Sequence, residues 1–276
     1  MKIIDSESLS EKIAAAYHSA NIHTRQEVAD FFSSVTSGNP LEEMIINTIE
    51  ENGSIASGCS IPLCQDTGIP IVFIEMPPEY CLSGDIEALT ENALQKITYS
   101  KGLRNSTVKS QISEQRSGLF NRAEIHIIPS HLPHMRVTVL VKGAGSENAS
   151  AMKMMNPSSK KDDIVEFVID QIRETGADAC PPYIMGIGIG GSSEQSALSA
   201  KMALTGQFND NESEDERYIA GEIMREGNEL KIGIQGMGLG NTLMDARVKI
   251  MPSHIATLAV SVVFQCFQHR MESFEL

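Results

Sequence analysis

The chain has 276 residues, of which 41% are apolar and 21% charged, as in an ordinary globular protein. This length suffices for one large domain or two smaller ones with hydrophobic cores. The net charge of −14 argues against nucleic acid or an anionic membrane as the main partner, although a local cation can still bind an anionic substrate. The sequence shows neither an apolar run of ~20 residues nor a signal-peptide core, so we expect a cytoplasmic protein.

Helices and strands are expected to alternate along the first half. The apolar spacing predicts helices over 8–35 (with a break at 21–24), 41–51 and 83–99, and strands over 69–73, 124–129 and 135–141. Asn52-Gly53 is expected to end the second helix, and the last two strands are expected to form a hairpin. Residues 104–122 lack a clear period and predict a loop.

The second half continues the alternation. It predicts helices over 161–175, 194–204 and 217–227, a buried strand over 183–189, glycine-rich loops over 142–148 and 231–240, an exposed acidic loop over 206–216, and apolar runs over 243–251 and 255–263. Ser192 or Ser193 is expected to cap the helix at 194–204. We therefore expect an α/β mixed fold, with a helical N-terminal region followed by mixed sheets flanked by helices.

The five cysteines are the first candidates for chemistry: Cys59, Cys64, Cys81, Cys180 and Cys266. Their odd number and wide spacing favour free thiols or metal ligands over a disulfide framework, and the lack of a CxxC pair argues against a zinc ribbon. Cys64 is followed directly by Gln65 and Asp66, and Cys180 by two prolines that stiffen its loop. Separated thiolates of this kind suggest a cluster assembled by the fold, with small buried core cysteines as the alternative.

Other motifs leave alternatives open. Residues 186–191 fit G-x-G-x-x-G, but no apolar run follows at 207–212, which disfavours a dinucleotide site. An anion-binding turn and glycines present for close packing remain equal alternatives. Taken alone, Arg104 is typical of a solvated arginine and His254 of a structural histidine.

Taken together, the motifs match a known family in order and spacing. They are Cys64-Gln65-Asp66-Thr67-Gly68, Leu103-Arg104-Asn105, Lys142-Gly143-Ala144-Gly145-Ser146-Glu147-Asn148, Ala179-Cys180-Pro181-Pro182, Gly188-Ile189-Gly190-Gly191 and Gln235-Gly236-Met237-Gly238. Over nearly its whole length, the chain resembles the α subunit, or N-terminal half, of the class I (iron-sulfur) fumarate hydratases and the related L(+)-tartrate dehydratases. Ala144, where the family has glycine, and residues 239–242 depart from the usual pattern.

The resemblance implies a [4Fe-4S] cluster and a set of site residues. The implied cluster ligands are Cys64, Cys180 and Cys266, of which Cys266 fits the family pattern most loosely. The implied substrate-binding residues are Gln65, Asp66, Arg104, Gly143, Gly145 and His254. Asp66 and His254 are also expected to be catalytic, with Asp66 assisting proton transfer.

The resemblance also implies the function. We expect residues 1–276 to form one α-subunit domain, with a helical subregion over 1–55, of a hydro-lyase that hydrates fumarate to L-malate in the tricarboxylic acid cycle. A separate β subunit is expected to complete a hetero-oligomer and to supply the catalytic base. Alternatives are an L(+)-tartrate dehydratase or mesaconate-type hydratase α subunit and, from another class, a non-catalytic iron-sulfur or redox-sensing module; a nucleotide-binding protein ranks third.

Overall fold

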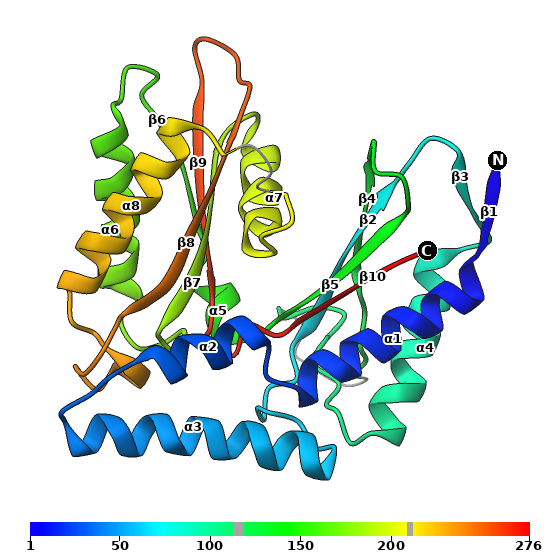
Figure 1. Ribbon diagram of the computed structural model, residues 1–276. Coiled ribbons are helices and arrows are strands. Elements are labelled where there is room, and N and C mark those ends of the chain that lie inside the picture. Colours follow the sequence, from blue (N-terminus) through cyan, green and yellow to red (C-terminus); the bar gives the residue numbers. More distant parts are fainter. Residues whose placement is uncertain (113–118, 209–211) are drawn as a thin grey trace. The chain divides into compact units, whose positions relative to one another are not determined.

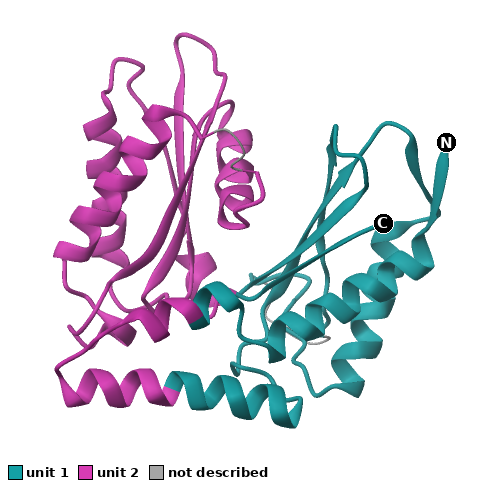
Figure 2. Ribbon diagram, viewed as in Figure 1, with its two compact units in different colours: residues 1–29, 49–143, 270–276 teal, residues 30–48, 144–269 magenta. Residues whose placement is uncertain are grey.

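The computed structural model describes residues 1–112, 119–208 and 212–276. They form two compact units, which Figure 2 distinguishes by colour. Unit 1 comprises residues 1–29, 49–143 and 270–276, and unit 2 comprises residues 30–48 and 144–269. Each unit contains a four-stranded sheet with helices packed on it, which confirms the expected α/β mixed class.

The sheet of unit 1 mixes parallel and antiparallel pairs. Its strands lie in the order β10 (Met271–Glu275), β5 (Arg136–Lys142), β2 (Ile69–Met76) and β4 (Glu124–Pro129). β2 runs parallel to β4 and antiparallel to β5. A separate parallel pair consists of β1 (Lys2–Asp5) and β3 (Tyr80–Ser83).

The expected hairpin of residues 124–129 with 135–141 is wrong. β4 and β5 do not pair with each other, because β2 lies between them and pairs with both. The side chains from Ile71 to Ile74 are at most 2% exposed. A strand buried on both faces takes a central place in a sheet, and here that strand is β2.

The helices of unit 1 begin with α1 (Ser6–Ile22), which packs against β5, β10 and α4 (Ile86–Ser100). The expected break at residues 21–24 is confirmed, since α2 (Gln26–Ser34) follows as a separate helix.

The next helix, α3 (Pro40–Cys59), runs past the end expected at Asn52-Gly53. A β-carbon at Gly53 would lie 2.6 Å from the Thr24 hydroxyl oxygen, so this glycine permits a close approach and does not end the helix.

Unit 2 contains the second sheet. Its strands lie in the order β6 (Ala151–Met155), β9 (Leu258–Gln265), β7 (Tyr183–Gly190) and β8 (Leu243–Met251). One face is covered by α7 (Ser193–Leu204) and the other by α6 (Lys161–Thr175) and α8 (Glu214–Glu229), as Figure 1 shows. The short helix α5 (Ala144–Asn148) and the 3-10 turn η1 (Ile234–Gly236) complete the unit.

The glycines of β7 allow a helix to lie close to the sheet. A β-carbon at Gly186 would lie 2.0 Å from the carbonyl oxygen of Ala200, and one at Gly188 would lie 2.0 Å from that of Ser196. Both carbonyls belong to α7, and Ser192 caps that helix. At Gly186 and Gly188, the structure therefore favours the close-packing alternative.

The N-terminus of α8 is fixed to the sheet by a buried carboxylate. Glu216 accepts hydrogen bonds from the backbone N–H of Ser213 (2.6 Å) and from that of Ile250 in β8 (2.7 Å). The Ser213 hydroxyl in turn accepts the Glu216 N–H, forming a capping box. This helix begins at Glu214, three residues earlier than the sequence predicts.

Two predicted loops fall partly outside the described residues. These are the segment at 104–122, of which 113–118 are not described, and the segment at 206–216, of which 209–211 are not described. A β-bridge joins Thr107 to Phe120 in the first. Across the described part of the chain, no helix has the length and apolar character that crossing a membrane requires.

Candidate active site

The Cys64 loop connects α3 to β2 in unit 1. The backbone N–H of Leu63 donates to the carbonyl of Asn21 (2.8 Å), and the carbonyl of Leu63 accepts from the Asn52 side chain (3.1 Å). Leu63 is buried, whereas Cys64 and Gln65 are exposed. The loop is thus fixed at its apolar residue and presents a thiol and a carboxamide to the exterior of the unit.

Asp66 is oriented by its own turn and by a buried arginine. One of its carboxylate oxygens accepts the N–H of Gly68 at 2.9 Å, and its backbone carbonyl accepts Nη1 of Arg270 at 2.7 Å. Arg270 is 1% exposed and also donates to the side chain of Asn21 at 2.6 Å. The Asp66 backbone is therefore held from the interior of unit 1.

Gly143 lies beside this carboxylate. A β-carbon at Gly143 would lie 3.1 Å from Oδ2 of Asp66 and 3.4 Å from Nη2 of Arg270. The structure thus brings together two of the expected substrate-binding residues, Asp66 and Gly143. Arg270 has no place among those expected residues; its only sequence signal is its position four residues after Cys266.

The turn after Asp66 is supported by Tyr17 of α1. Its hydroxyl donates to the carbonyls of Thr67 (2.9 Å) and Gly68 (3.0 Å). Burial raises the pKa of Tyr17, so the phenol stays protonated and remains a hydrogen-bond donor at neutral pH. Arg104 follows α4, and its side chain is exposed.

Two cysteine loops are adjacent in unit 2. The backbone N–H of Phe267 donates to the carbonyl of Cys180 at 3.1 Å, which places the Cys180 segment next to Cys266. The thiol-bearing residue Cys180 is exposed and has a φ of 55°, and Cys266 is half-buried. These two expected ligands therefore come from segments 86 positions apart that meet directly after β9.

The loop that carries Cys180 is hydrogen-bonded to η1. The Pro181–Pro182 peptide bond is cis, and the Pro181 carbonyl accepts both the backbone N–H (2.9 Å) and the side-chain amide (3.1 Å) of Gln235. Burial raises the pKa of Tyr183, and the nearby Cys180 and Asp178 add to this effect. The tyrosine hydroxyl consequently stays protonated at neutral pH.

Gly145 and His254 occupy other parts of unit 2. Gly145 is in α5, where a β-carbon would lie 2.9 Å from the carbonyl of Asp178, and it lines a polar pocket of about 360 Å³. His254 is exposed in the turn between β8 and β9, where its ring nitrogen accepts the N–H of Ala256 at 3.1 Å. The eight-residue strand β9, roughly 25 Å long, separates this turn from Cys266, so the unit does not bring His254 beside the thiols.

Within the described ranges, no three His, Cys, Asp or Glu side chains form a group that could hold a metal ion. Cys64 belongs to unit 1, whereas Cys180 and Cys266 belong to unit 2. All five cysteines are free thiols, and the three that are expected to bind the cluster lie in loops outside the helices and strands. Thiolates are suitable ligands for an iron-sulfur cluster.

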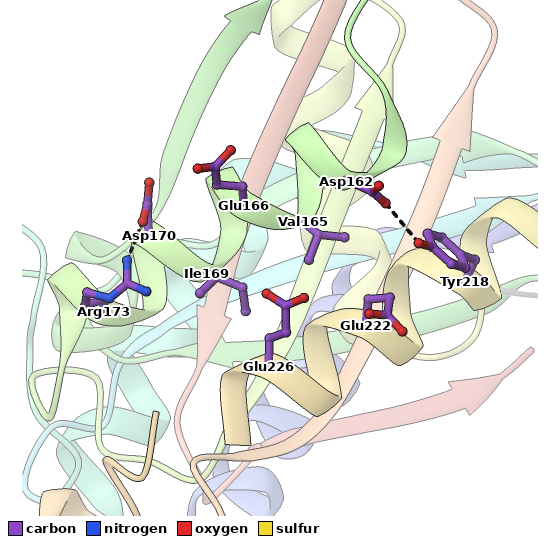
Figure 3. Close-up of a pocket in the computed structure, with 9 residues that line it drawn as sticks. All are labelled: Asp162, Val165, Glu166, Ile169, Asp170, Arg173, Tyr218, Glu222 and Glu226. Carbon is purple, nitrogen blue, oxygen red and sulfur yellow. Dashed lines mark hydrogen bonds and ion pairs between the residues drawn. The ribbon is translucent and has the colours of Figure 1, made fainter. Parts of the chain in front are cut away.

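A separate groove runs between α6 and α8 (Figure 3). It has a volume of about 430 Å³ and is lined by Asp162, Val165, Glu166, Ile169, Asp170, Arg173, Tyr218, Glu222 and Glu226. Five of these side chains are carboxylates, which repel an anionic substrate. None of the expected site residues lines this groove.

Comparisons with known proteins agree with the motifs. A family model described as fumarate hydratase (Fumerase) matches residues 10–275. A Methanocaldococcus jannaschii protein, provisionally named L(+)-tartrate dehydratase subunit alpha, is 30% identical over 271 residues, covering 95% of each chain. L(+)-tartrate dehydratase subunit alpha of Escherichia coli K12 is 26% identical over 234 residues, covering 83% of this chain and 77% of its own. By the extent of these matches, the chain belongs to the fumarate hydratase (Fumerase) family of hydro-lyases.

Proposed function

We propose that this chain is the α subunit of a two-subunit [4Fe-4S] hydro-lyase that adds water to, or removes it from, a four-carbon dicarboxylate. The observation that carries the proposal is the family match over residues 10–275. The names of the relatives, which are alpha subunits, support a separate partner subunit and an assembly of the two chains.

Cys64, Cys180 and Cys266 are the residues proposed to hold the cluster. The adjacent backbones of Cys180 and Cys266 and the exposure of Cys64 are compatible with this role. When bound, such a cluster supplies a Lewis acid for the hydroxyl group that leaves or adds. The metal content of the protein therefore tests this ligand set directly.

Within this proposal, the chain's own residues bind and orient the substrate. Arg104 binds one carboxylate, for which a guanidinium offers a bidentate fork. Gln65, Gly143 and Gly145 are proposed to contact the same ligand. Asp66 is proposed to assist proton transfer, because its turn and Arg270 fix its position.

His254 is also proposed to contact the substrate and take part in catalysis, a role that rests on the family resemblance. Its distance from Cys266 along β9 means that this role needs a test of its own. A His254→Gln variant that keeps the wild-type kcat and KM would remove this residue from the site.

Two substrates are the main candidates. The Lys142–Asn148 loop resembles that of the fumarases and supports fumarate and L-malate. The names of the relatives support L(+)-tartrate at least as well. Turnover of fumarate, L-malate, L(+)-tartrate and mesaconate by the anaerobically purified pair of subunits decides between them.

The ligand set is tested by iron and sulfide analysis of the chain co-expressed with its partner subunit. We expect about four irons per α chain in the wild type and loss of iron in Cys64→Ser, Cys180→Ser and Cys266→Ser. Cys59→Ser, which changes an exposed cysteine outside the proposed set, is the matched control and should retain the iron. Iron that survives Cys266→Ser would show that the third ligand is misassigned.

The non-catalytic alternative predicts a different pattern. An iron-sulfur sensor keeps its iron but turns over none of the four dicarboxylates, even with its partner. A chain that binds no iron in the presence of the partner would contradict both proposals.

A further inference from the structure

The backbone of Arg104 is held by the side chain of Thr67. The Thr67 hydroxyl accepts the backbone N–H of Arg104 at 3.0 Å and lies 3.3 Å from its carbonyl, to which it donates. Thr67 is 1% exposed and directly follows Asp66 in the chain. A single buried side chain thus connects the Cys-Gln-Asp turn to a residue 37 positions later.

The two sides of this contact differ in how they are supported. On one side, the Thr67 carbonyl accepts a hydrogen bond from Tyr17, whose side chain is fully buried. On the other side, α4 ends at Ser100, and the described residues that follow it up to residue 112 form no helix. Arg104 therefore takes its position from the hydrogen bonds that its backbone makes.

A second buried side chain completes the support. Asn121, which is 1% exposed, donates to the Arg104 carbonyl at 2.9 Å and to the Thr98 hydroxyl at 2.6 Å. It also accepts the N–H of Ser106 at 3.1 Å. Asn121 joins the segment to α4, and Thr67 joins it to the turn that carries Asp66.

We propose that Thr67 is a positioning residue that fixes Arg104 relative to Asp66, so that the guanidinium can bind a substrate carboxylate. This inference rests on the proposed function. Thr67 does not contact the substrate; it acts through the Arg104 backbone. The hydroxyl of Thr67 positions Arg104 through its hydrogen bonds, and the branched shape of the side chain is not required.

The test uses two variants that separate hydroxyl from shape. Thr67→Val keeps the branched shape and removes the hydroxyl, and Thr67→Ser keeps the hydroxyl. In the full chain, we expect amide hydrogen exchange over residues 103–107 to be about tenfold faster in Thr67→Val than in the wild type, and close to wild type in Thr67→Ser. Wild-type exchange in Thr67→Val would overturn the proposal.

Kinetics of the two-subunit enzyme give the second readout. We expect Thr67→Val to raise KM for the dicarboxylate about tenfold with a smaller change in kcat, and Thr67→Ser to restore KM to within about twofold. The iron content should match the wild type in both variants. Should Thr67→Val fail to fold, Thr67→Ala, which also removes the hydroxyl, carries the same measurement.

A double-mutant cycle distinguishes positioning from general damage. In an Arg104→Ala background, Thr67→Val should no longer change KM, because the group that it positions is absent. An equal further rise in KM would contradict the proposal. If the wild-type pair turns over no dicarboxylate, the proposed function fails, while the exchange experiment still decides whether Thr67 holds the Arg104 segment.

Discussion

At the scale of single residues, one methyl group added at Gly143 should be enough to disturb the candidate site. Its missing side chain leaves the space beside Oδ2 of Asp66 and Nη2 of Arg270. We predict that Gly143→Ala lowers kcat/KM at least about tenfold, because the added methyl displaces a carboxylate that must be placed closely.

The matched control for this prediction is Gly38→Ala. A β-carbon at Gly38 meets no atom within 4 Å, so the same substitution there should leave kcat/KM unchanged. Steady-state kinetics of both variants, with thermal unfolding to verify folding, provide the measurement. Equal activity of the two variants would show that the space beside Asp66 is not needed.

Some residues of the candidate site could be found from sequence motifs, and others could not. Cys64 and Asp66 stand in a compact motif, so a resemblance can point to them. Arg270 and Thr67 act through contacts across 204 and 37 positions, and neither contact leaves a periodic pattern. A buried arginine also looks like any surface arginine in the sequence, because the fold alone decides which one is covered.

At the scale of elements, the contact of β7 with α7 depends on two glycines. We predict that Gly188→Ala lowers the free energy of unfolding by about 3 kcal/mol or more, because its methyl would collide with the backbone of α7 and the helix must move away. Gly221→Ala is the control, since Gly221 lies in α8 with no atom within 4 Å of the added methyl.

The control should change stability in the opposite direction. Alanine has a higher helix propensity than glycine, so Gly221→Ala is expected to raise the free energy of unfolding by up to about 1 kcal/mol. Urea unfolding followed by circular dichroism measures both. A Gly188→Ala protein as stable as the wild type would mean that β7 and α7 can separate at little cost.

Helices and strands were predicted correctly where the local apolar pattern determines them. The prediction failed where pairing between strands distant in the sequence determines the structure. The helix expected at 161–175 has those bounds in the structure, because its apolar stripe faces one core. The pairing of β4 was mispredicted, since closeness in sequence suggested a hairpin and burial of β2 decided otherwise. Similarly, Gly53 suggests a helix end in the sequence, whereas its packing against Thr24 explains it in the structure.

At the scale of the whole molecule, stability in acid should depend on Glu216. Burial raises the pKa of this carboxyl, but hydrogen bonds from the N–H groups of Ser213 and Ile250, the Ser213 hydroxyl and the charge of Lys249 together outweigh it, so the pKa is lowered. A lowered pKa in the folded state stabilises the protein above the unfolded-state pKa, and that stabilisation is lost as the pH falls through the folded-state value.

We therefore predict a pH-dependent difference between the wild type and Glu216→Gln. The wild type should be more stable at pH 7, and the difference should shrink below about pH 4.5, where the unfolded carboxyl takes up a proton. Urea unfolding from pH 4 to 7 measures it, with Glu214→Gln, an exposed change on the same helical turn, as control. A constant difference across this range would contradict the prediction.

The whole-molecule organisation was only partly predictable. The composition and the alternation of predicted helices and strands indicate a mixed α/β protein, which the structure confirms. The division into two units could not be predicted from the sequence, because unit 1 is assembled from three separate segments and unit 2 from two. One domain over residues 1–276, with a helical subregion over 1–55, stays a prediction.

The pairing of β10 with β5 has a consequence for biosynthesis. β10 occupies residues 271–275 and forms the edge of a sheet whose other strands are complete by residue 142. At the usual rate of translation, the ribosome needs on the order of ten seconds to add the intervening residues. During that interval, the nascent chain carries β5 with one edge unpaired, so this strand is where a ribosome-associated chaperone would protect the growing protein.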